Sequence, residues 1–197
     1  MRTYEFPETT FDARLTLVDS AQAFHWREWD GMFYSVSGGM ALRVAPLGAG
    51  IRVDAPDDCP EDFVKRYFDL DRDYDAIARE YSDCPRADEA FKRLPGLRIL
   101  RQPPWEALLA FLLSQNNNTA RIAKLVRALC EGYGARCEAF GRTLYAFPGA
   151  RALAEAGSEA LRALGAGYRA EYIVESARRV ADGFPLEALA DMPYDEA

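Results

Sequence analysis

Two polar segments of the sequence contain side chains that could recognise a ligand. The first is the Ser-Gln-Asn-Asn-Asn run at 114–118 with Arg121 after it, and the second is a Gly-Ala-Gly turn at 165–167 followed by Tyr168 and Arg169. An arginine fork donates hydrogen bonds and stays protonated, so these groups suit recognition rather than nucleophilic attack. On propensity alone, the asparagines would cap two helices, Tyr168 would be a core residue and both arginines would be solvated.

The cysteines add no further site through their spacing. Cys59, Cys84, Cys130 and Cys137 form no C-x-x-C pair, and His25 is the single histidine. We therefore expect free, mostly buried thiols in a reducing, cytoplasmic compartment, with no disulfide framework, no metal and no cofactor.

The sequence ahead of these polar segments begins with a stretch typical of β-strands. From Leu15 and Leu17 onward the apolar side chains alternate, and glycine-containing turns interrupt them, as in an antiparallel meander. Helical spacing replaces this pattern over residues 63–68 and 74–81. The fold class expected is α+β: an N-terminal twisted antiparallel β-sheet domain with two helices at 1–95, followed by a helical domain at 96–197.

The second half of the sequence predicts a series of helices. A proline pair at 103–104 opens one helix, and we expect its Trp105 and Phe111 to lie in the core. A second helix begins near Thr119. A further helix runs from about residue 168 to residue 182, so the Gly-Ala-Gly turn directly precedes it.

Charge is distributed unevenly along the chain, whose net charge is −7. Residues 52–92 carry 7 basic and 13 acidic side chains, whereas residues 98–180 carry 12 basic and 7 acidic ones. An anionic partner should therefore meet the second half, although solvated helix faces would produce the same split. No apolar run approaches the ~18 to 20 residues of a membrane span, so no membrane partner is expected.

The order of these segments resembles the 8-oxoguanine DNA glycosylases, and the resemblance extends through nearly the whole chain. The long S-Q-N-N-N-x-A-R-I string followed by G-x-G-Y-R-A is far more specific than a lone glycine motif. The stretches that carry the resemblance are DSAQAFHWRE at 19–28, RYFDLD at 66–71, LRILRQPPWEALLAFLLSQNNNTARI at 97–122, LYAFP at 144–148 and LGAGYRAEYI at 164–173.

The resemblance implies a role in DNA binding for four residues. Asn116, Arg121 and Arg169 would contact the orphan cytosine left when the damaged guanine leaves the stack, and Tyr168 would be the wedge. These types fit, because extruding a base costs a few kcal/mol and an aromatic ring beside the gap can recover ~1 to 3 kcal/mol. The cytosine edge needs the donors that an amide and two guanidinium groups supply.

The lesion-recognition segment departs from the family pattern. In members of this family a backbone carbonyl, normally that of a glycine, accepts a hydrogen bond from the N7–H group of 8-oxoguanine. Ala21 stands at that position here. The carbonyl is kept, but a methyl group is added, which leaves the lesion preference open. His25 stands where an arginine is usual. Strand alternation predicts that Phe24 and Trp26 enter the core while His25 points outward as a surface or structural residue.

Catalysis in the family uses a lysine after a glycine hairpin, and then an aspartate. The only lysines here are Lys65, Lys92 and Lys124, and none follows such a hairpin. We therefore expect the catalytic residues to lie beyond Ala197, with no catalytic residue in this chain and the glycosylase domain ending before its helix-hairpin-helix. Alternatively, the 165–167 turn is itself that hairpin, with the non-nucleophilic Arg169 in the lysine position.

The terminal pattern agrees with this expectation, since Pro193 and the acidic residues after it are typical of a helix start.

The function expected is base-excision repair: an 8-oxoguanine-type DNA glycosylase and AP lyase acting on oxidised purine opposite cytosine. The alternative is a noncatalytic damaged-DNA-binding module or an inactive remnant. The expected partner is double-stranded DNA containing a damaged base, in the cytoplasm or on a prokaryotic nucleoid. A C-terminal segment or another chain would cover any exposed apolar face.

Overall fold

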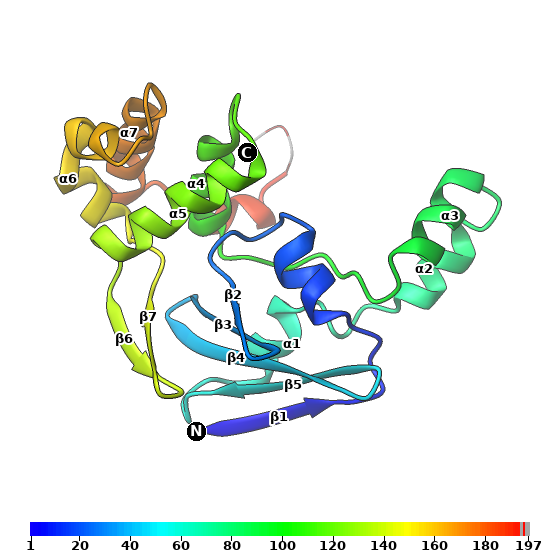
Figure 1. Ribbon diagram of the computed structural model, residues 1–197. Helices are drawn as coiled ribbons and strands as arrows, with labels where there is room; N and C mark the ends of the chain where they lie inside the picture. Colours follow the sequence, from blue (N-terminus) through cyan, green and yellow to red (C-terminus); the bar gives the residue numbers. More distant parts are fainter. Residues whose placement is uncertain (194, 196–197) are drawn as a thin grey trace. The chain divides into compact units, whose positions relative to one another are not determined.

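The computed structural model describes residues 1–193 and 195 and divides the chain into two compact units. The first unit comprises residues 1–36 and 40–101, and the second comprises residues 37–39 and the chain from residue 102 onward. The first unit carries a five-stranded sheet and the second is mainly helical, so the fold is α+β, as expected (Figure 1).

The sheet is built from strands close in sequence. They are paired in the order β1-β5-β4-β3-β2. The register places Arg2 opposite Ala55 and Phe6 opposite Ile51 in an antiparallel β1–β5 pair. The strands are β1 (Arg2–Phe6), β2 (Arg27–Trp29), β3 (Met32–Ser37), β4 (Met40–Leu47) and β5 (Gly50–Ala55).

The strand expected at Leu15 and Leu17 is wrong. Leu15–Asp19 forms a short π-helix, in which the Ser20 amide donates to the Leu15 carbonyl at 2.9 Å. The Asp12 carboxylate accepts the Leu15 amide proton at 2.8 Å, as a helix N-cap does. This local cap supports the helical start, and Leu17 is buried without a strand, so the apolar alternation was misleading here.

Helices cover the remainder of the first unit. α1 (Glu61–Tyr67) and α2 (Tyr74–Glu80) lie where helical spacing predicted them, and α3 (Pro85–Arg93) was not anticipated. Trp26 is buried as expected, and its Nε1 donates to the Tyr67 hydroxyl at 3.0 Å. Together with the strands, α1 therefore encloses an aromatic core.

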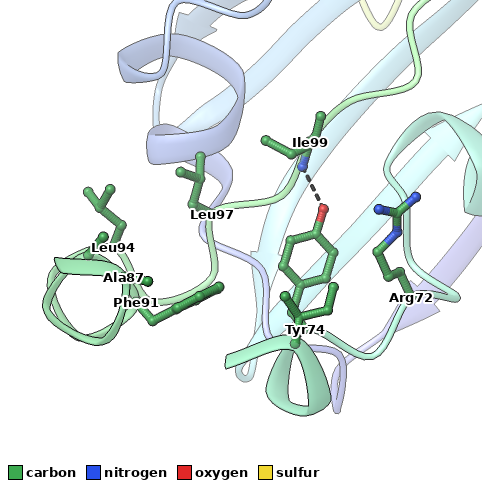
Figure 2. Close-up of a pocket in the computed structure, with 9 residues that line it drawn as sticks. Arg72, Tyr74, Ala87, Phe91, Leu94, Leu97 and Ile99 are labelled. Atoms are coloured by element: carbon green, nitrogen blue, oxygen red, sulfur yellow. Dashed lines mark hydrogen bonds between the residues drawn. The ribbon is translucent and has the colours of Figure 1, made fainter. Parts of the chain in front are cut away.

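A cavity of about 390 Å³ lies beside α2 and α3. Figure 2 shows its apolar lining, with Phe91, Leu94 and Leu97 along the wall and the Tyr74 hydroxyl accepting a hydrogen bond from the Ile99 amide. The tyrosine also donates to the Asp69 carboxylate at 2.9 Å. Because its hydroxyl is already engaged twice, the cavity presents apolar surface rather than reactive groups.

The second unit consists of helices and one hairpin. β6 and β7 pair as an antiparallel hairpin, and the expected helices near 104, 119 and 168 are all present. The elements are α4 (Pro104–Ser114), α5 (Thr119–Tyr133), β6 (Arg136–Ala139), β7 (Arg142–Tyr145), α6 (Ala150–Ala163), α7 (Arg169–Ala181) and η2 (Leu186–Asp191). The helix start expected at Pro193 falls mainly on Tyr194, Glu196 and Ala197, which lie outside the described residues.

A glycine closes α5 against the hairpin. A Cβ atom on Gly134 would lie 1.9 Å from the Ala146 carbonyl oxygen, so no side chain fits there. The Ala146 amide in turn donates to the Ala135 carbonyl at 2.9 Å. This close approach holds β7 beside the end of α5, and it explains in steric terms why glycine ends the helix.

Two expected core residues of α4 behave differently. Trp105 is half-buried, and its Nε1 donates to the Pro148 carbonyl at 2.9 Å. Phe111 is 65% exposed, so its assignment to the core is wrong. The helix buries the face that carries Glu106, Leu109, Ala110 and Leu113 instead. Helical spacing predicted correctly that α4 buries one side, and Leu109 of the predicted stripe is fully buried, but Phe111 was added wrongly because α4 is apolar around most of its circumference.

The buried face of α4 includes a carboxylate. Glu106 is 6% exposed and accepts hydrogen bonds from the Ser37 hydroxyl at 2.6 Å and the Gly38 amide at 2.9 Å. Burial raises the pKa of Glu106, and these two donors act in the opposite direction. The acid therefore anchors residues 37–39 to the helical unit.

In the described part of the chain, no helix is both long and apolar enough to cross a membrane.

His25 is shielded rather than directed outward, which corrects the expectation from strand alternation. The residue is only partly exposed, and its Nε2 atom is buried. Burial lowers the pKa of His25 to about 4, so the imidazole is neutral at pH 7. It follows Phe24 in an irregular segment before β2, where alternate facing does not apply.

The lowered pKa of His25 predicts how the unfolding free energy depends on pH. The folded-state pKa lies below the unfolded value of about 6.5, so the folded form binds the proton less well. The unfolding free energy should fall by about 3 kcal/mol as pH drops from about 6.5 towards 4. Urea unfolding at several pH values measures this, and His25→Gln should remove the slope between pH 5 and 6.5. An imidazole that titrates near 6.5 by NMR would contradict the assignment.

Candidate functional site

The three asparagines of the loop between α4 and α5 make different interactions. Asn117 donates from Nδ2 to the Leu113 carbonyl at 3.0 Å, and Asn118 accepts the Arg121 amide proton at 3.0 Å. These two residues therefore cap the end of α4 and the start of α5. Asn116 instead has a φ of 47°, in the left-handed region, and its side chain is exposed. The capping interpretation thus accounts for two asparagines and leaves Asn116 available.

The turn between α6 and α7 is built by two glycines in the left-handed region. Gly165 has a φ of 96° and Gly167 a φ of 62°. L-residues rarely adopt such angles, so this backbone requires the Gly-x-Gly sequence. Ala166 between them is buried, and it fixes the turn against the unit's core. The chain leaves the turn at Tyr168, the N-cap of α7.

Arg169 joins this turn to the asparagine loop. Its side chain is 3% exposed, and Nε donates to the Gln115 carbonyl at 2.7 Å. Nη2 donates to the same carbonyl and to the Asn116 carbonyl at 2.8 Å. Nη1 completes the set with a longer bond of 3.4 Å to the Ala166 carbonyl. The guanidinium therefore binds backbone oxygens from two segments more than fifty residues apart.

Tyr168 lies at the surface beside this arginine. It is 49% exposed, and its hydroxyl donates to the Gln115 carbonyl at 3.2 Å. The Arg169 Cζ lies 4.6 Å from the ring centroid, within the range of a cation–π contact. The Tyr172 ring meets it edge to face with the centroids 6.4 Å apart. The tyrosine ring is thus supported from the protein side and still presents an aromatic surface to solvent.

Arg121 approaches the same turn from α5. Its Nη2 donates to the Gly165 carbonyl at 3.3 Å, and the side chain is exposed. The structure therefore brings together all four residues selected from the sequence: Asn116, Arg121, Tyr168 and Arg169. Sequence reasoning missed Gln115 and Tyr172. Gln115 contributes a backbone carbonyl, which residue type does not reveal, whereas Tyr172 could have been found from its position one helical turn after Tyr168.

Ala21 belongs to the first unit, where its φ of 56° places it in the left-handed region. The following side chain fixes this conformation. Gln22 donates to the Arg98 carbonyl at 2.8 Å and accepts the Leu100 amide proton at 2.9 Å. The positive φ is one that glycine adopts without strain and that alanine adopts only at some cost.

Nucleophilic and metal-binding groups are sparse around these segments. Lys65 pairs with Glu61 and Lys92 with Asp88, whereas Lys124 is exposed on α5. All four cysteines are free. Over residues 1–193 and 195, no group of three or more His, Cys, Asp or Glu side chains is placed to hold a metal ion. The cluster can therefore recognise a ligand by hydrogen bonding and stacking.

Comparison with known proteins relates this geometry to a family. The protein-family model described as 8-oxoguanine DNA glycosylase, N-terminal domain, matches residues 3–108. The model described as HhH-GPD superfamily base excision DNA repair protein matches residues 109–195. The junction of the two matches lies inside α4, a few residues after the boundary between the two units.

Individual relatives agree with these matches. The N-glycosylase/DNA lyase OGG1 of Arabidopsis thaliana is 32% identical over 184 residues, which are 85% of this chain and 49% of the plant protein. The chain thus spans about half the length of that relative. MBOgg1, in complex with a low affinity DNA ligand, superposes with a TM-score of 0.88 at 31% identity, covering 100% of this chain and 72% of that one.

A second solved structure contains a defined DNA. It is the Clostridium acetobutylicum 8-oxoguanine glycosylase/lyase in complex with double-stranded DNA containing cytosine opposite 8-oxoG. The TM-score is 0.84 at 30% identity, and the match covers 95% of this chain and 66% of that chain.

The left-handed backbone at Asn116 predicts an unusual order of stability. Asn116→Ala should lower the unfolding free energy by about 1 kcal/mol, because asparagine adopts the left-handed region more readily than alanine does, whereas Asn116→Gly should leave it unchanged or raise it slightly. Both variants lose the amide, so their difference isolates the backbone effect. Urea unfolding measures it, and an alanine variant as stable as the glycine variant would contradict the assigned conformation.

Proposed function

This chain belongs to the 8-oxoguanine DNA glycosylase family of base-excision repair glycosylase/lyases, and we propose that it supplies the strand-opening and orphan-base elements for excision of oxidised purine opposite cytosine. The supporting observation is the shared anchoring of the cluster. The exposed Tyr168 ring and the exposed Asn116 side chain flank Gln115, whose carbonyl accepts from Tyr168 and Arg169.

In this proposal Tyr168 is the wedge. Extruding a nucleotide leaves a gap in the stack, and the cost of a few kcal/mol must be offset by new contacts. An aromatic ring placed beside the gap contributes ~1 to 3 kcal/mol through stacking. Tyr168 suits this task because its ring is half exposed while its hydroxyl is anchored to the Gln115 carbonyl. An anchored ring loses little conformational entropy on insertion.

Asn116 and Arg121 are the proposed cytosine contacts. An orphan cytosine presents N3 and O2 as acceptors and N4 as a donor, so an amide and a guanidinium together complement its edge. Both side chains are exposed, and Arg121 makes one long bond of 3.3 Å to Gly165 that it can exchange for a base. The cytosine opposite 8-oxoG in the bacterial relative's DNA supports this choice of base.

Ala21 is the proposed lesion contact, through its backbone carbonyl. An 8-oxoguanine carries an N7 proton that guanine lacks, so a carbonyl acceptor distinguishes the two bases. The side chain of Gln22 is bonded at both ends to residues 98–100, which holds the preceding peptide in place. The added methyl group of Ala21 narrows the space beside this carbonyl and sets the tolerance for other oxidised purines.

The excision step is proposed to use a lysine outside this chain. A lysine that attacks C1′ must be near the extruded nucleotide and easily deprotonated. Lys65 pairs with Glu61 and Lys92 pairs with Asp88, and none of the three lysines, Lys124 included, follows a glycine hairpin in the sequence. The same observation favours a second candidate function: a module that binds distorted DNA without cleaving it.

Duplex binding tests the proposed recognition. This chain should bind a duplex with a tetrahydrofuran abasic analogue opposite cytosine more tightly than an intact duplex. Tyr168→Ala should reduce that preference roughly 5- to 150-fold, as the loss of ~1 to 3 kcal/mol of stacking predicts. Tyr168→Phe keeps the ring and loses only the hydroxyl, so it should retain most of the preference. Fluorescence anisotropy at fixed salt gives all the affinities.

The wild-type chain provides the decisive comparison. Equal affinity for the abasic and the intact duplex would remove the wedge assignment. Retention of the full preference by Tyr168→Ala would show that another group fills the gap.

Borohydride trapping tests the proposed division of labour. Incubation of this chain with an 8-oxoguanine·cytosine duplex and sodium borohydride should give no covalent adduct, because the proposal assigns the nucleophile to a lysine that follows a glycine hairpin and none of the three lysines here does. Gel electrophoresis under denaturing conditions measures the adduct, with a competent glycosylase/lyase as positive control. A robust adduct that disappears in Lys124→Arg would instead identify a catalytic lysine on α5.

A further inference from the structure

We propose that Gln22 is a positioning residue that sets lesion selectivity: its carboxamide fixes the peptide that carries the Ala21 carbonyl, and it takes no part in opening the strand. This role rests on the proposed lesion contact of Ala21. It also goes beyond that contact, because it requires that discrimination between 8-oxoguanine and guanine can be lost while the affinity for an abasic site is kept.

The carboxamide of Gln22 pairs with main chain as a neighbouring strand would. Its Nε2 donates to the Arg98 carbonyl at 2.8 Å, and its Oε1 accepts the Leu100 amide proton at 2.9 Å. Residues 97–101 lie in no strand, so this side chain takes the place of a ladder partner. It can do so because a side-chain amide presents a donor and an acceptor side by side, as a peptide group does. The backbone of Gln22, which supplies the nitrogen of the peptide after Ala21, is thereby tied to that segment.

Arg98 makes this segment a fixed support within the first unit. Its side chain is 5% exposed, and its guanidinium donates to the Thr10 carbonyl at 2.9 Å and to the Asp69 carbonyl at 2.6 Å. Its Cζ lies 4.6 Å from the Tyr74 ring centroid, and the Tyr74 hydroxyl accepts the Ile99 amide proton at 2.8 Å. Displacing the segment would leave buried polar groups without partners, which is costly. Gln22 is therefore bonded to a part of the unit that resists movement.

The residues on the other side of Ala21 are held by the same support. Thr16 is fully buried, and its Oγ1 accepts the Arg98 amide proton at 3.2 Å. Ser20 donates from Oγ to the Thr16 carbonyl at 2.8 Å and accepts a hydrogen bond from the Gln22 Nε2 at 3.0 Å. Ala21 thus lies between two neighbours that are bonded to each other and, through them, to the support.

The backbone conformation of Ala21 depends on these neighbours. Its φ of 56° lies in the left-handed region, which is unfavourable for alanine. Such a conformation persists only where the surrounding contacts over-determine it. Without the Gln22 amide, we expect residues 20–22 to relax towards ordinary backbone angles and the Ala21 carbonyl to change direction.

A carbonyl held in one direction is what separates the two bases. 8-Oxoguanine presents an N7–H donor, whereas guanine presents N7 as an acceptor. A fixed carbonyl at this position therefore attracts the lesion and repels the normal base. A mobile carbonyl would turn away from guanine N7, so it would lose rejection as well as recognition. An abasic site has no base for the carbonyl to meet, so its affinity should not depend on Gln22.

Binding to three duplexes tests this role. In Gln22→Leu, which keeps side-chain bulk and loses the amide, the affinity ratio between 8-oxoguanine·cytosine and guanine·cytosine duplexes should fall roughly threefold to tenfold, as the loss of about one neutral hydrogen bond predicts. Affinity for the abasic analogue opposite cytosine should stay at the wild-type value. Gln102→Leu is the matched control, because it makes the same change at another half-buried glutamine, and its ratio should remain that of the wild type. Fluorescence anisotropy at fixed salt gives all the affinities.

Three outcomes of this series would overturn the proposal: an unchanged ratio in Gln22→Leu, an equal fall in Gln102→Leu, or a parallel loss of affinity for the abasic duplex in Gln22→Leu. The last would mean that Gln22 supports the unit as a whole and not the carbonyl alone. Equal wild-type affinity for the 8-oxoguanine·cytosine and guanine·cytosine duplexes would instead refute the proposed lesion contact. The mobility of Ala21 in the DNA-free chain would then still decide whether Gln22 fixes it.

NMR relaxation of the DNA-free chain measures that mobility. Backbone order parameters of Ala21 and Gln22 should be about 0.85, the value of rigid backbone, and should fall below about 0.6 in Gln22→Leu. In Gln102→Leu they should stay at the wild-type values. Rigid values at both residues in Gln22→Leu would overturn the proposal, whatever the DNA affinities.

A measurement on the wild-type chain avoids any folding defect of the variant. The Nε2 protons of Gln22 should exchange slowly with solvent, because they are bonded to the Arg98 carbonyl and the Ser20 hydroxyl. On addition of the 8-oxoguanine·cytosine duplex they should keep this protection. Rapid exchange in the free chain, or release of the carboxamide on binding, would overturn the proposal.

Discussion

The Gln115 carbonyl is the acceptor on which the candidate site depends. It lies one residue past the end of α4, and it receives both the Tyr168 hydroxyl and the Arg169 guanidinium from the start of α7. Two segments that are distant in sequence therefore meet at this atom, and the bond from Arg169 to the Asn116 carbonyl joins them again one residue later. A backbone acceptor is insensitive to its own side chain, so the arrangement depends on the α4 terminus and on the residues that reach it.

Recognition of the site from sequence worked where residue type carries information. The Gly-x-Gly turn needed positive φ at both glycines, and the structure shows 96° and 62° there. The helix after the turn was expected, so Tyr168 and Arg169 could be placed at its first turn. The sequence did not show that Arg169 would be buried on carbonyls, because an arginine after a turn is usually solvated. Only the positions of Gln115 and Asn116 in space decide that question.

The fold could be predicted to a similar depth. Glycine turns and alternation located β3, β4 and β5, and helical spacing located α1, α2, α4, α5 and α7. The errors arose where a local interaction outweighed the pattern, as at Leu15, where the Asp12 cap supports a helical turn. The prediction that Phe111 lies in the core failed for a different reason. Nearly every face of α4 is apolar, so periodicity cannot identify which side meets the core. The burial of Glu106 was not predicted, because a charged side chain is usually exposed.

Under the proposed function, this acidic chain must place its cations where the phosphates of DNA would lie, and its net charge of −7 makes their distribution decisive. Residues 98–180 have five more basic than acidic side chains, by the counts of 12 and 7. Arg169 contributes to that total, but its guanidinium is buried and donates to the carbonyls of Gln115 and Asn116. Arg121, Lys124 and Arg127 are exposed on α5 and retain their charge for an external partner. Burial therefore distinguishes Arg169 from the cations of this half that can attract DNA to the site.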